Sequence, residues 1–368
     1  MRLEDYTFFA EETPSPALVY YPELIQKNID SMLKIAPAGR LWPHIKTFKM
    51  RPVLEMLIAS GITKFKCSTI LEAKLAAESG ATDVLLAYPL VGPNISRFLS
   101  LIPAFPATTF YALGDDVEVL SRLSKQAQEK DLIIPTFLDI NIGMDRTGAL
   151  PEEVASRYET ISHLPGLTCA GLHCYGGHLK NADWAAQKKQ VIEEQATLRA
   201  IEETLQAKGY CVDATIVAGT PTFPLHAAYP HFYLSPGTAT IFDYGYASKF
   251  PSLPFTPAAA IMARVISRPA PHKFTVDVGC KAIASDPVGA KGLILELPHA
   301  TPVSQSEEHW VFTVEKEEDL PAIETVLHII PTHICPTTAL YPFVYVVENH
   351  KIVGHWTVDA RDRTLQPK

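Results

Sequence analysis

A few residues in the sequence have types and spacings that could do chemistry. Lys46 lies in PHIKTFK, and a partly desolvated lysine amine can form a Schiff base with a carbonyl compound. Lys49 is the competing candidate, and its place at the start of an expected helix predicts a contact with solvent or a carboxylate. Taken alone, Lys46 is more simply interpreted as a surface lysine at a strand end. Of the two lysines it is the one that ends an expected strand, where a side chain can point into a binding pocket.

Two glycine-containing segments offer further polar groups. DINIGMDRTG (139–148) places Arg146 between two glycines, and an arginine there could hold an anionic oxygen. GLHCYGGH (171–178) places His173 and Tyr175 on one face of an expected strand, because side chains alternate along a strand. For His173 alone, packing inside the strand is the simpler interpretation.

Two later segments, AGTPT (218–222) and SPGTAT (235–240), combine glycine and threonine after expected strands. Backbone N–H groups beside a hydroxyl can bind phosphate, and barrels bind it at the loops after their last two strands. The candidates are Gly219, Thr220, Gly237 and Thr238. The P-loop pattern is absent from the sequence.

HICPTTALY (333–341) contains a pair of candidate metal ligands. If residues 333–335 are extended, His333 and Cys335 face the same side, because strand side chains alternate. Imidazole and thiolate together suit Zn²⁺. Two close ligands indicate an open catalytic site completed by water, although an H-x-C pair also arises without any metal.

The elements that must position these residues follow from the hydrophobic pattern. Strands are expected at 17–20, 40–46, 64–67, 83–87, 107–111, 132–140, 167–173, 214–218 and 231–235. Helices are expected near 22–35, 70–79, 114–129 and 151–162, and most clearly at 183–208, where Gly209 follows as a stop signal. Eight strands that alternate with helices predict an α/β fold, a (β/α)8 TIM-type barrel, with an open doubly wound sheet as the rival.

After residue 245 the segments are short, β-branched and aromatic, which predicts a second, C-terminal β-rich domain. We therefore expect a barrel over 15–245 and a β-rich domain over 246–368 together with 1–14. The additional strand at 17–20 is expected to pair with the C-terminal region. In a barrel, the residues that act lie at the C-terminal ends of strands, where most of the candidates fall.

Composition narrows the classes of partner. The net charge of −8 and the lack of a dense basic stretch argue against nucleic acid. The sequence contains neither a long apolar run nor a secretory signal pattern, so we expect no membrane partner and a cytoplasmic location. The six scattered cysteines form no C-x-x-C pair, which predicts reduced thiols.

Taken together, these motifs resemble one family. PHIKTFK, DINIGMDRTG, GLHCYGGH, AGTPT, SPGTATIFD, DVGCKAIASD and HICPTTALY occur in the order seen in D-threonine aldolases and eukaryotic-type D-serine dehydratases. These are fold-type III pyridoxal-phosphate enzymes with an alanine racemase-like N-terminal barrel. The resemblance covers about residues 15 to 360, nearly the whole chain.

The resemblance implies a role for each candidate. Lys46 would carry pyridoxal phosphate, Arg146 would lie near its phenolic oxygen, and Tyr175 would lie near the pyridine ring and its nitrogen. The phosphate would be held by Gly219, Thr220, Gly237 and Thr238. A divalent metal, zinc or manganese, would be bound by His333 and Cys335. The family forms homodimers in which the partner's β-domain borders the barrel mouth, and Asp286 could lie in that rim.

Two departures weaken the carry-over of details of substrate handling. Many relatives have a second histidine where this chain has Phe48, and Pro221 removes one N–H donor from the first phosphate loop. Neither departure affects the lysine or the metal pair.

The resemblance implies a lyase that acts on small D-3-hydroxy amino acids. If a base removes the β-hydroxyl proton, Cα–Cβ breaks and the products are glycine and an aldehyde. If Lys46 removes the Cα proton, the hydroxide leaves with help from the metal, and the products are ammonia and a keto acid. We expect the D-threonine aldolase-like reaction, with a D-serine dehydratase-like ammonia-lyase as the alternative. A non-catalytic cofactor-binding protein and an amino acid racemase are the remaining alternatives.

Overall fold

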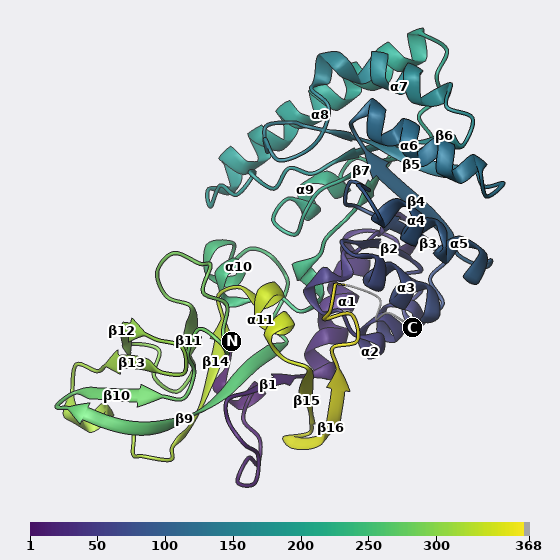
Figure 1. Cartoon of the computed structure of the whole chain (residues 1–368). Helices are drawn as coiled ribbons and strands as arrows, with labels where there is room; N and C mark the ends of the chain where they lie inside the picture. Colours follow the sequence, from purple (N-terminus) through teal and green to yellow (C-terminus); the bar gives the residue numbers. More distant parts are fainter. Residues whose placement is uncertain (364–368) are drawn as a thin grey trace. The chain divides into compact units, whose positions relative to one another are not determined.

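The computed structural model describes residues 1–363 and divides the chain into two compact units (Figure 1). The barrel unit is built mainly from residues 33–46 and 54–237. The β-rich unit is built from residues 1–32, 47–53 and 238–361. The N-terminal strand at 17–20 therefore lies in the β-rich unit. Within the described part of the chain, no helix is long and apolar enough to cross a membrane.

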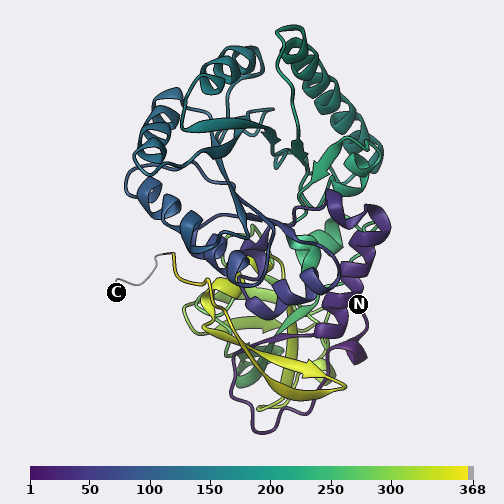
Figure 2. The same cartoon turned by 90° about the vertical axis from the view of Figure 1, so that its right-hand side faces the viewer.

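The barrel unit contains a parallel sheet of seven strands in sequential order, with helices on its outside (Figure 2). The strands are β2 (Lys64–Cys67), β3 (Asp83–Leu86), β4 (Thr109–Gly114), β5 (Ile134–Ile140), β6 (Leu167–Cys174), β7 (Thr215–Val217) and β8 (Phe232–Leu234). The helices are α3 (Ile70–Glu78), α4 (Asn94–Leu99), α5 (Leu101–Ala104), α6 (Val117–Gln128), α7 (Val154–Ser162), α8 (Trp184–Ala207) and α9 (Phe223–Ala227). Short 3₁₀ turns lie at Ala38–Arg40 and Pro151–Glu153. The predicted barrel class is thereby confirmed.

The predicted strand at 40–46 is wrong as a regular strand. Leu41 makes a single parallel bridge to Leu234 of β8, and His44 makes one to Lys66 of β2. These two bridges join the first and last strands of the sheet, so the segment occupies the position expected of the eighth strand. Its pairing stays irregular because Pro43 has no N–H to donate and because 3₁₀ turns flank the segment. Lys46 lies in the second of these turns, Ile45–Thr47.

Aromatic side chains fill the interior of the barrel. The ring of Trp42 makes edge contacts with Tyr111, Phe137 and Tyr233 at centroid distances of 5.4, 6.3 and 6.4 Å. This packing makes the interior a solid core, as in other barrels, and leaves the strand ends to form a site.

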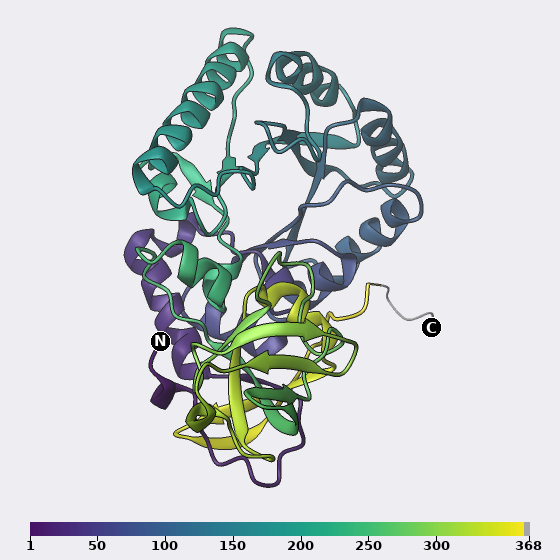
Figure 3. The ribbon, with the colours of Figure 1, turned by 90° about the vertical axis from the view of Figure 1, so that its left-hand side faces the viewer.

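The β-rich unit contains a mixed sheet in which the long strand β9 is central (Figure 3). Its strands are β1 (Ala17–Tyr20), β9 (Ala259–Ala270), β10 (Lys273–Val276), β11 (Gly292–Ile294), β12 (Thr301–Gln305), β13 (Trp310–Thr313), β14 (Val326–Pro331), β15 (Phe343–Glu348) and β16 (Lys351–Thr357). Strand β1 pairs antiparallel with β9 and parallel with β15, which confirms the predicted pairing with the C-terminal region.

Four helices and three 3₁₀ turns complete the described elements. The helices are α1 (Pro22–Ile35), α2 (Arg51–Ala59), α10 (Tyr244–Lys249) and α11 (Ile334–Leu340), and the turns are Leu3–Asp5, Thr238–Thr240 and Glu317–Asp319. The best-defined helical prediction, 183–208, corresponds to α8. Asp183 caps its first turn by accepting from Ala185 N at 3.0 Å, and Gly209 follows with a left-handed φ of +86°.

Candidate active site

A pocket of about 540 Å³ lies in the barrel unit at the C-terminal ends of its strands. Its lining includes polar side chains from the segment after Leu41 and from β2, β6 and the loop after β5. These side chains are His44, Lys46, Lys66, Arg146, His173 and Tyr175. The structure therefore brings together three of the predicted site residues, Lys46, Arg146 and Tyr175, because parallel strands bring their C-terminal ends to one edge of the sheet.

Lys46 and Lys49 have different surroundings. Lys46 is half-buried and lines the pocket, and its backbone N–H donates to Nδ1 of His44 at 3.4 Å. The Lys49 Nζ donates to the Ala360 carbonyl at 3.2 Å within the β-rich unit. A carbonyl contact gives Lys49 a structural role, which leaves Lys46 as the better placed of the two amines.

The pocket also holds a buried network that the sequence analysis missed. His173 donates from Nδ1 to Asp139 Oδ1 at 2.7 Å, because an ionised carboxylate can only accept. Its other ring nitrogen, Nε2, is 3.3 Å from Lys66 Nζ. Thr147 Oγ1 donates to the second oxygen of Asp139 at 2.7 Å. Strands β2, β5 and β6 thus meet in a chain of polar contacts beneath the pocket.

The charges in this network follow from burial and proximity. Burial is the main cause that lowers the pKa of Lys66 to about 7, and the charge of Lys46 acts in the same direction. Burial also lowers the pKa of His173, which keeps its ring neutral. Burial opposes the ionisation of Asp139, but the hydrogen bonds from His173 and Thr147 outweigh it and lower its pKa. The network therefore consists of a carboxylate, a neutral imidazole and an amine that titrates near neutrality.

A signal for Lys66 was present in the sequence. KFKC (64–67) is a short strand between two turns. It contains two lysines, and Lys66 is the one near the C-terminal end of the strand. Lys64 and Lys66 share a face by alternation, and Lys66 is the one nearer the C-terminal end of the strand, where a barrel carries its site.

Replacing Lys66 by methionine is expected to raise the unfolding temperature by a few degrees at pH 6 and to change it less at pH 10. The pKa of Lys66 falls from 10.5 to about 7 on folding. Between these values the unfolded chain binds more protons, so wild-type stability rises with pH across this window. Lys66→Met removes that slope, whereas Lys64→Met should retain it. Thermal unfolding at pH 6, 8 and 10 measures the slopes, and equal slopes in all three proteins would contradict the buried amine.

Arg146, Tyr175 and Gly219 lie close together at the pocket. The Arg146 guanidinium carbon is 5.1 Å from the centre of the Tyr175 ring, and Lys66 Nζ is 5.5 Å from it. A Cβ atom added at Gly219 would come within 3.0 Å of this ring, which explains why glycine suits that position. Ser235 Oγ, at the end of β8, is buried and has no hydrogen-bond partner among the described residues. An unpaired buried hydroxyl beside a predicted phosphate loop is a donor that a phosphate oxygen could satisfy.

The other phosphate-loop candidates are distributed between the units. Thr220 is buried in the loop after β7, and Gly237 ends the barrel unit. Thr238 belongs to the β-rich unit, where its Oγ1 is 3.7 Å from the Cys335 sulfur. The structure therefore brings Thr238 to the metal-ligand candidate.

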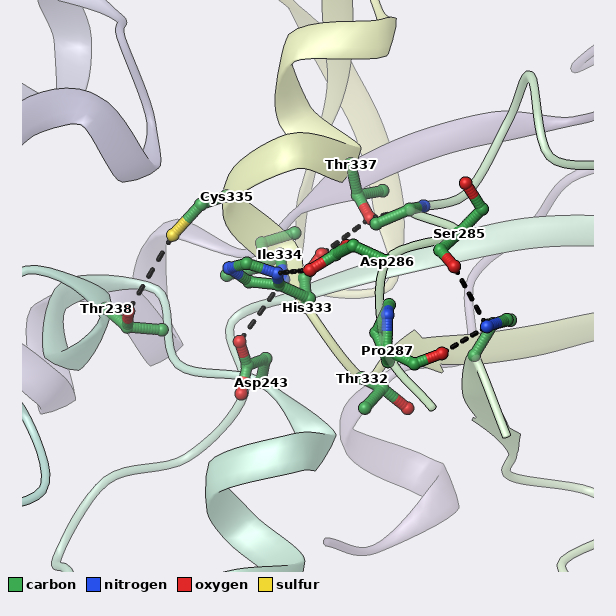
Figure 4. Close-up of polar contacts among 12 residues, drawn as sticks. Thr238, Asp243, Ser285, Asp286, Pro287, Thr332, His333, Ile334, Cys335 and Thr337 are labelled. Atoms are coloured by element: carbon green, nitrogen blue, oxygen red, sulfur yellow. Dashed lines mark hydrogen bonds and ion pairs between the residues drawn. The ribbon is translucent and has the colours of Figure 1, made fainter. Parts of the chain in front are cut away.

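His333 and Cys335 do not have the predicted geometry: Figure 4 shows the Cys335 sulfur directed at Thr238 and the His333 ring directed at Asp286. The expectation of an extended segment 333–335 is wrong, because α11 begins at Ile334 and His333 is its N-cap residue, with φ −137° and ψ 100°. Cys335 therefore lies in the first turn of α11. The Cys335 sulfur is also 3.3 Å from Thr47 Oγ1.

The chemistry of this pair fits a divalent cation. Burial opposes a charge on His333, yet the contacts with Cys335 and Asp286 outweigh it and raise the pKa of His333 to about 9. The surroundings thus favour a positive charge, and a metal ion can take the place of that proton. Among residues 1–363, no group of three or more His, Cys, Asp or Glu side chains could hold a metal. A metal here would have two protein ligands and positions open to water or substrate.

Comparisons with known proteins agree with this description. The alanine racemase N-terminal domain matches residues 22–245, and the putative serine dehydratase domain matches residues 258–347. A D-threonine aldolase from Arthrobacter sp is 25% identical over 357 residues, which are 95% of this chain and 93% of the relative.

Solved structures show the same fold. The D-threonine aldolase from Filomicrobium marinum matches with a TM-score of 0.87 at 24% identity, covering 95% of this chain and 96% of that one. The D-threo-3-hydroxyaspartate dehydratase from Delftia sp. HT23 matches with a TM-score of 0.80 at 22% identity, covering 94% of this chain and 97% of that one. Structures of variants of such a dehydratase replace a histidine and a cysteine two positions apart, and the cysteine variant is metal-free.

The family model that matches residues 22–245 spans more than half of the chain and includes the pocket of the barrel unit. The relatives that match nearly the whole chain are aldolases and dehydratases. The chain therefore belongs to the alanine racemase N-terminal domain family, and it is an enzyme of the pyridoxal-phosphate-dependent lyase type.

Proposed function

We propose that this chain is a lyase that cleaves D-3-hydroxy amino acids with pyridoxal phosphate and a divalent metal. The observation that carries the proposal is the presence of both chemical parts in one chain. These are a lysine in a polar pocket of an alanine racemase-like barrel and a soft histidine–cysteine pair on α11. A racemase has no need of a metal, and therefore no need of the histidine–cysteine pair.

Three residues of the barrel pocket, Lys46, Arg146 and Tyr175, fit the cofactor. Lys46 would hold it covalently, Arg146 would bind its phenolic oxygen, and Tyr175 would pack against its ring. Its phosphate would be held by Gly219, Thr220, Gly237 and Thr238. When bound, pyridoxal phosphate supplies a sink for the electrons of the bond broken at Cα.

Within this class we propose retro-aldol cleavage as the reaction. Two relatives whose matches cover at least 95% of this chain, at 25% and 24% identity, are aldolases of D-threonine and 3-hydroxy-D-aspartate. Cleavage of Cα–Cβ requires a base for the β-hydroxyl proton, and Lys66 is a pocket amine whose pKa of about 7 suits that task. A metal held by His333 and Cys335 would supply a Lewis acid.

Elimination of ammonia is the second candidate, and one observation favours it. The spacing of His333 and Cys335 equals that of the histidine and cysteine replaced in the dehydratase variants. In this reaction Lys46 would remove the Cα proton, and the hydroxyl would leave. The two reactions would use the same cofactor-binding and metal-binding residues. They differ in the base, which is Lys66 in the retro-aldol cleavage and Lys46 in the elimination.

Incubation with D-threonine is expected to yield glycine in excess over ammonia, and chelation is expected to lower the rate at least about 100-fold. Glycine, ammonia and the aldehyde are measured together, before and after EDTA treatment and after addition of Zn²⁺ or Mn²⁺. Excess ammonia, from D-threonine or D-serine, would replace the aldolase by the second candidate. A rate that EDTA leaves unchanged while the bound metal is lost would remove the metal from the proposal.

We further propose that the enzyme acts as a homodimer, since the resemblance implies that the partner's β-domain borders each active site. Sedimentation of the purified holoenzyme tests this, and a monomer with full activity would contradict it.

A further inference from the structure

Asp286 contacts the metal-ligand candidate His333 directly (Figure 4). Asp286 Oδ2 is 2.6 Å from His333 Nδ1. A carboxylate accepts, so the imidazole donates its Nδ1–H, and in the neutral ring the lone pair must then lie on Nε2. The contact therefore selects the tautomer in which Nε2 can bind a metal.

The segment that carries Asp286 is fixed to the helix that carries the ligands. Ala284 N donates to Thr337 Oγ1 at 3.1 Å, and the same hydroxyl donates to the His333 carbonyl at 2.7 Å. On the other side, Lys291 Nζ donates to the carbonyls of Ser285, at 2.9 Å, and Pro287. Backbone contacts before and after Asp286 thus hold its carboxylate against the imidazole.

A second carboxylate nearby has a different task. Asp243 is buried, and its two oxygens accept from Tyr246 N at 2.9 Å and from Ile334 N at 3.2 Å. Both partners are backbone N–H groups, so Asp243 holds the main chain at the start of α11. Asp286 differs because it accepts from the ring of His333 itself.

The exposure of the pair argues against a stabilising role. The side chains of His333 and Asp286 are 40% and 54% exposed. An ion pair this exposed contributes little to the free energy of unfolding, because water and salt screen it. The His333–Asp286 contact is held in place by the surrounding backbone but contributes little to the free energy of unfolding, so it needs another explanation.

We propose that Asp286 is the positioning residue of the metal site and increases the affinity of His333 and Cys335 for a divalent cation. The proposal rests on the proposed function, which makes His333 and Cys335 metal ligands. Histidine ligands commonly donate their second N–H to a carboxylate, which orients the ring and makes the ligand nitrogen more basic. Loss of such a partner typically weakens metal binding about 10- to 100-fold.

The test compares Asp286→Ala and Asp286→Asn with wild-type holoenzyme. Zn²⁺ affinity is measured by competition with a chelating dye, and thermal unfolding is measured after metal removal. We expect binding to weaken about 10- to 100-fold in Asp286→Ala and less in Asp286→Asn, whose amide oxygen still accepts from Nδ1–H. Glu317→Gln removes the same charge from an exposed position and should bind Zn²⁺ like wild type.

The outcomes separate the inference from the proposed function. If wild type binds no Zn²⁺ or Mn²⁺, the metal role in the proposed function fails. If wild type binds Zn²⁺ and Asp286→Ala binds it equally well, the role of Asp286 is overturned while the metal site stands. Weaker binding together with a large loss of metal-free stability would also overturn it, because the carboxylate would then be structural.

Discussion

Replacing Lys46 by alanine is expected to lower turnover of D-threonine by about 10⁴-fold or more and to abolish the visible absorbance of covalently held cofactor. The physical reason is that the proposal makes this amine the covalent attachment point of the cofactor and, in the second candidate reaction, also the base that removes the Cα proton, and alanine can perform neither task. Steady-state kinetics and an absorbance spectrum of the purified variant measure the two effects.

Lys49→Ala is the matched control, because Lys49 is three residues away and its amine contacts a backbone carbonyl. We expect it to retain the spectrum and most of the activity. A Lys46→Ala protein with wild-type spectrum and turnover would overturn the assignment. A colourless wild type that stays colourless with added pyridoxal phosphate would remove the cofactor from the account.

Cys335→Ala is expected to lower the affinity for Zn²⁺ more than about 100-fold and to lower turnover in parallel. A direct ligand should matter more than the 10- to 100-fold typical of a residue that only orients one. Because Cys335 is partly exposed and its replacement is small, the variant should fold. Elemental analysis of the dialysed protein and kinetics with graded Zn²⁺ measure the two losses.

Cys211→Ala serves as the thiol control, since Cys211 is exposed and belongs to the barrel unit. It should keep both metal and activity. If Cys335→Ala kept wild-type metal content, the histidine–cysteine pair would not be the metal site. If it lost metal and kept turnover, the metal would have no part in the reaction.

The residues that sequence could place are those that follow strands. Lys46, Arg146 and Tyr175 were expected at strand ends, and the structure brings all three to one pocket. That expectation depends only on the parallel order of the strands, so it holds even though segment 40–46 does not pair as a regular strand. Pro43 prevents regular pairing there, yet the bridges of Leu41 and His44 keep the segment in its place.

The residues that sequence could not place depend on contacts between distant segments. Lys66 gains its lowered pKa from burial and from Lys46, and neither is visible in KFKC. Asp286 is 47 residues from His333, and no local pattern joins them. The H-x-C pair was found by its composition, but its geometry was assigned to a strand when a helix begins inside it.

Reduction of the cofactor-loaded enzyme with borohydride tests the central claim most directly. The reduced linkage is permanent, so digestion and mass spectrometry identify the lysine that carries the pyridoxyl group. The account predicts that the group lies on Lys46. A label on Lys66, the second amine of the same pocket, or on Lys49 would contradict it.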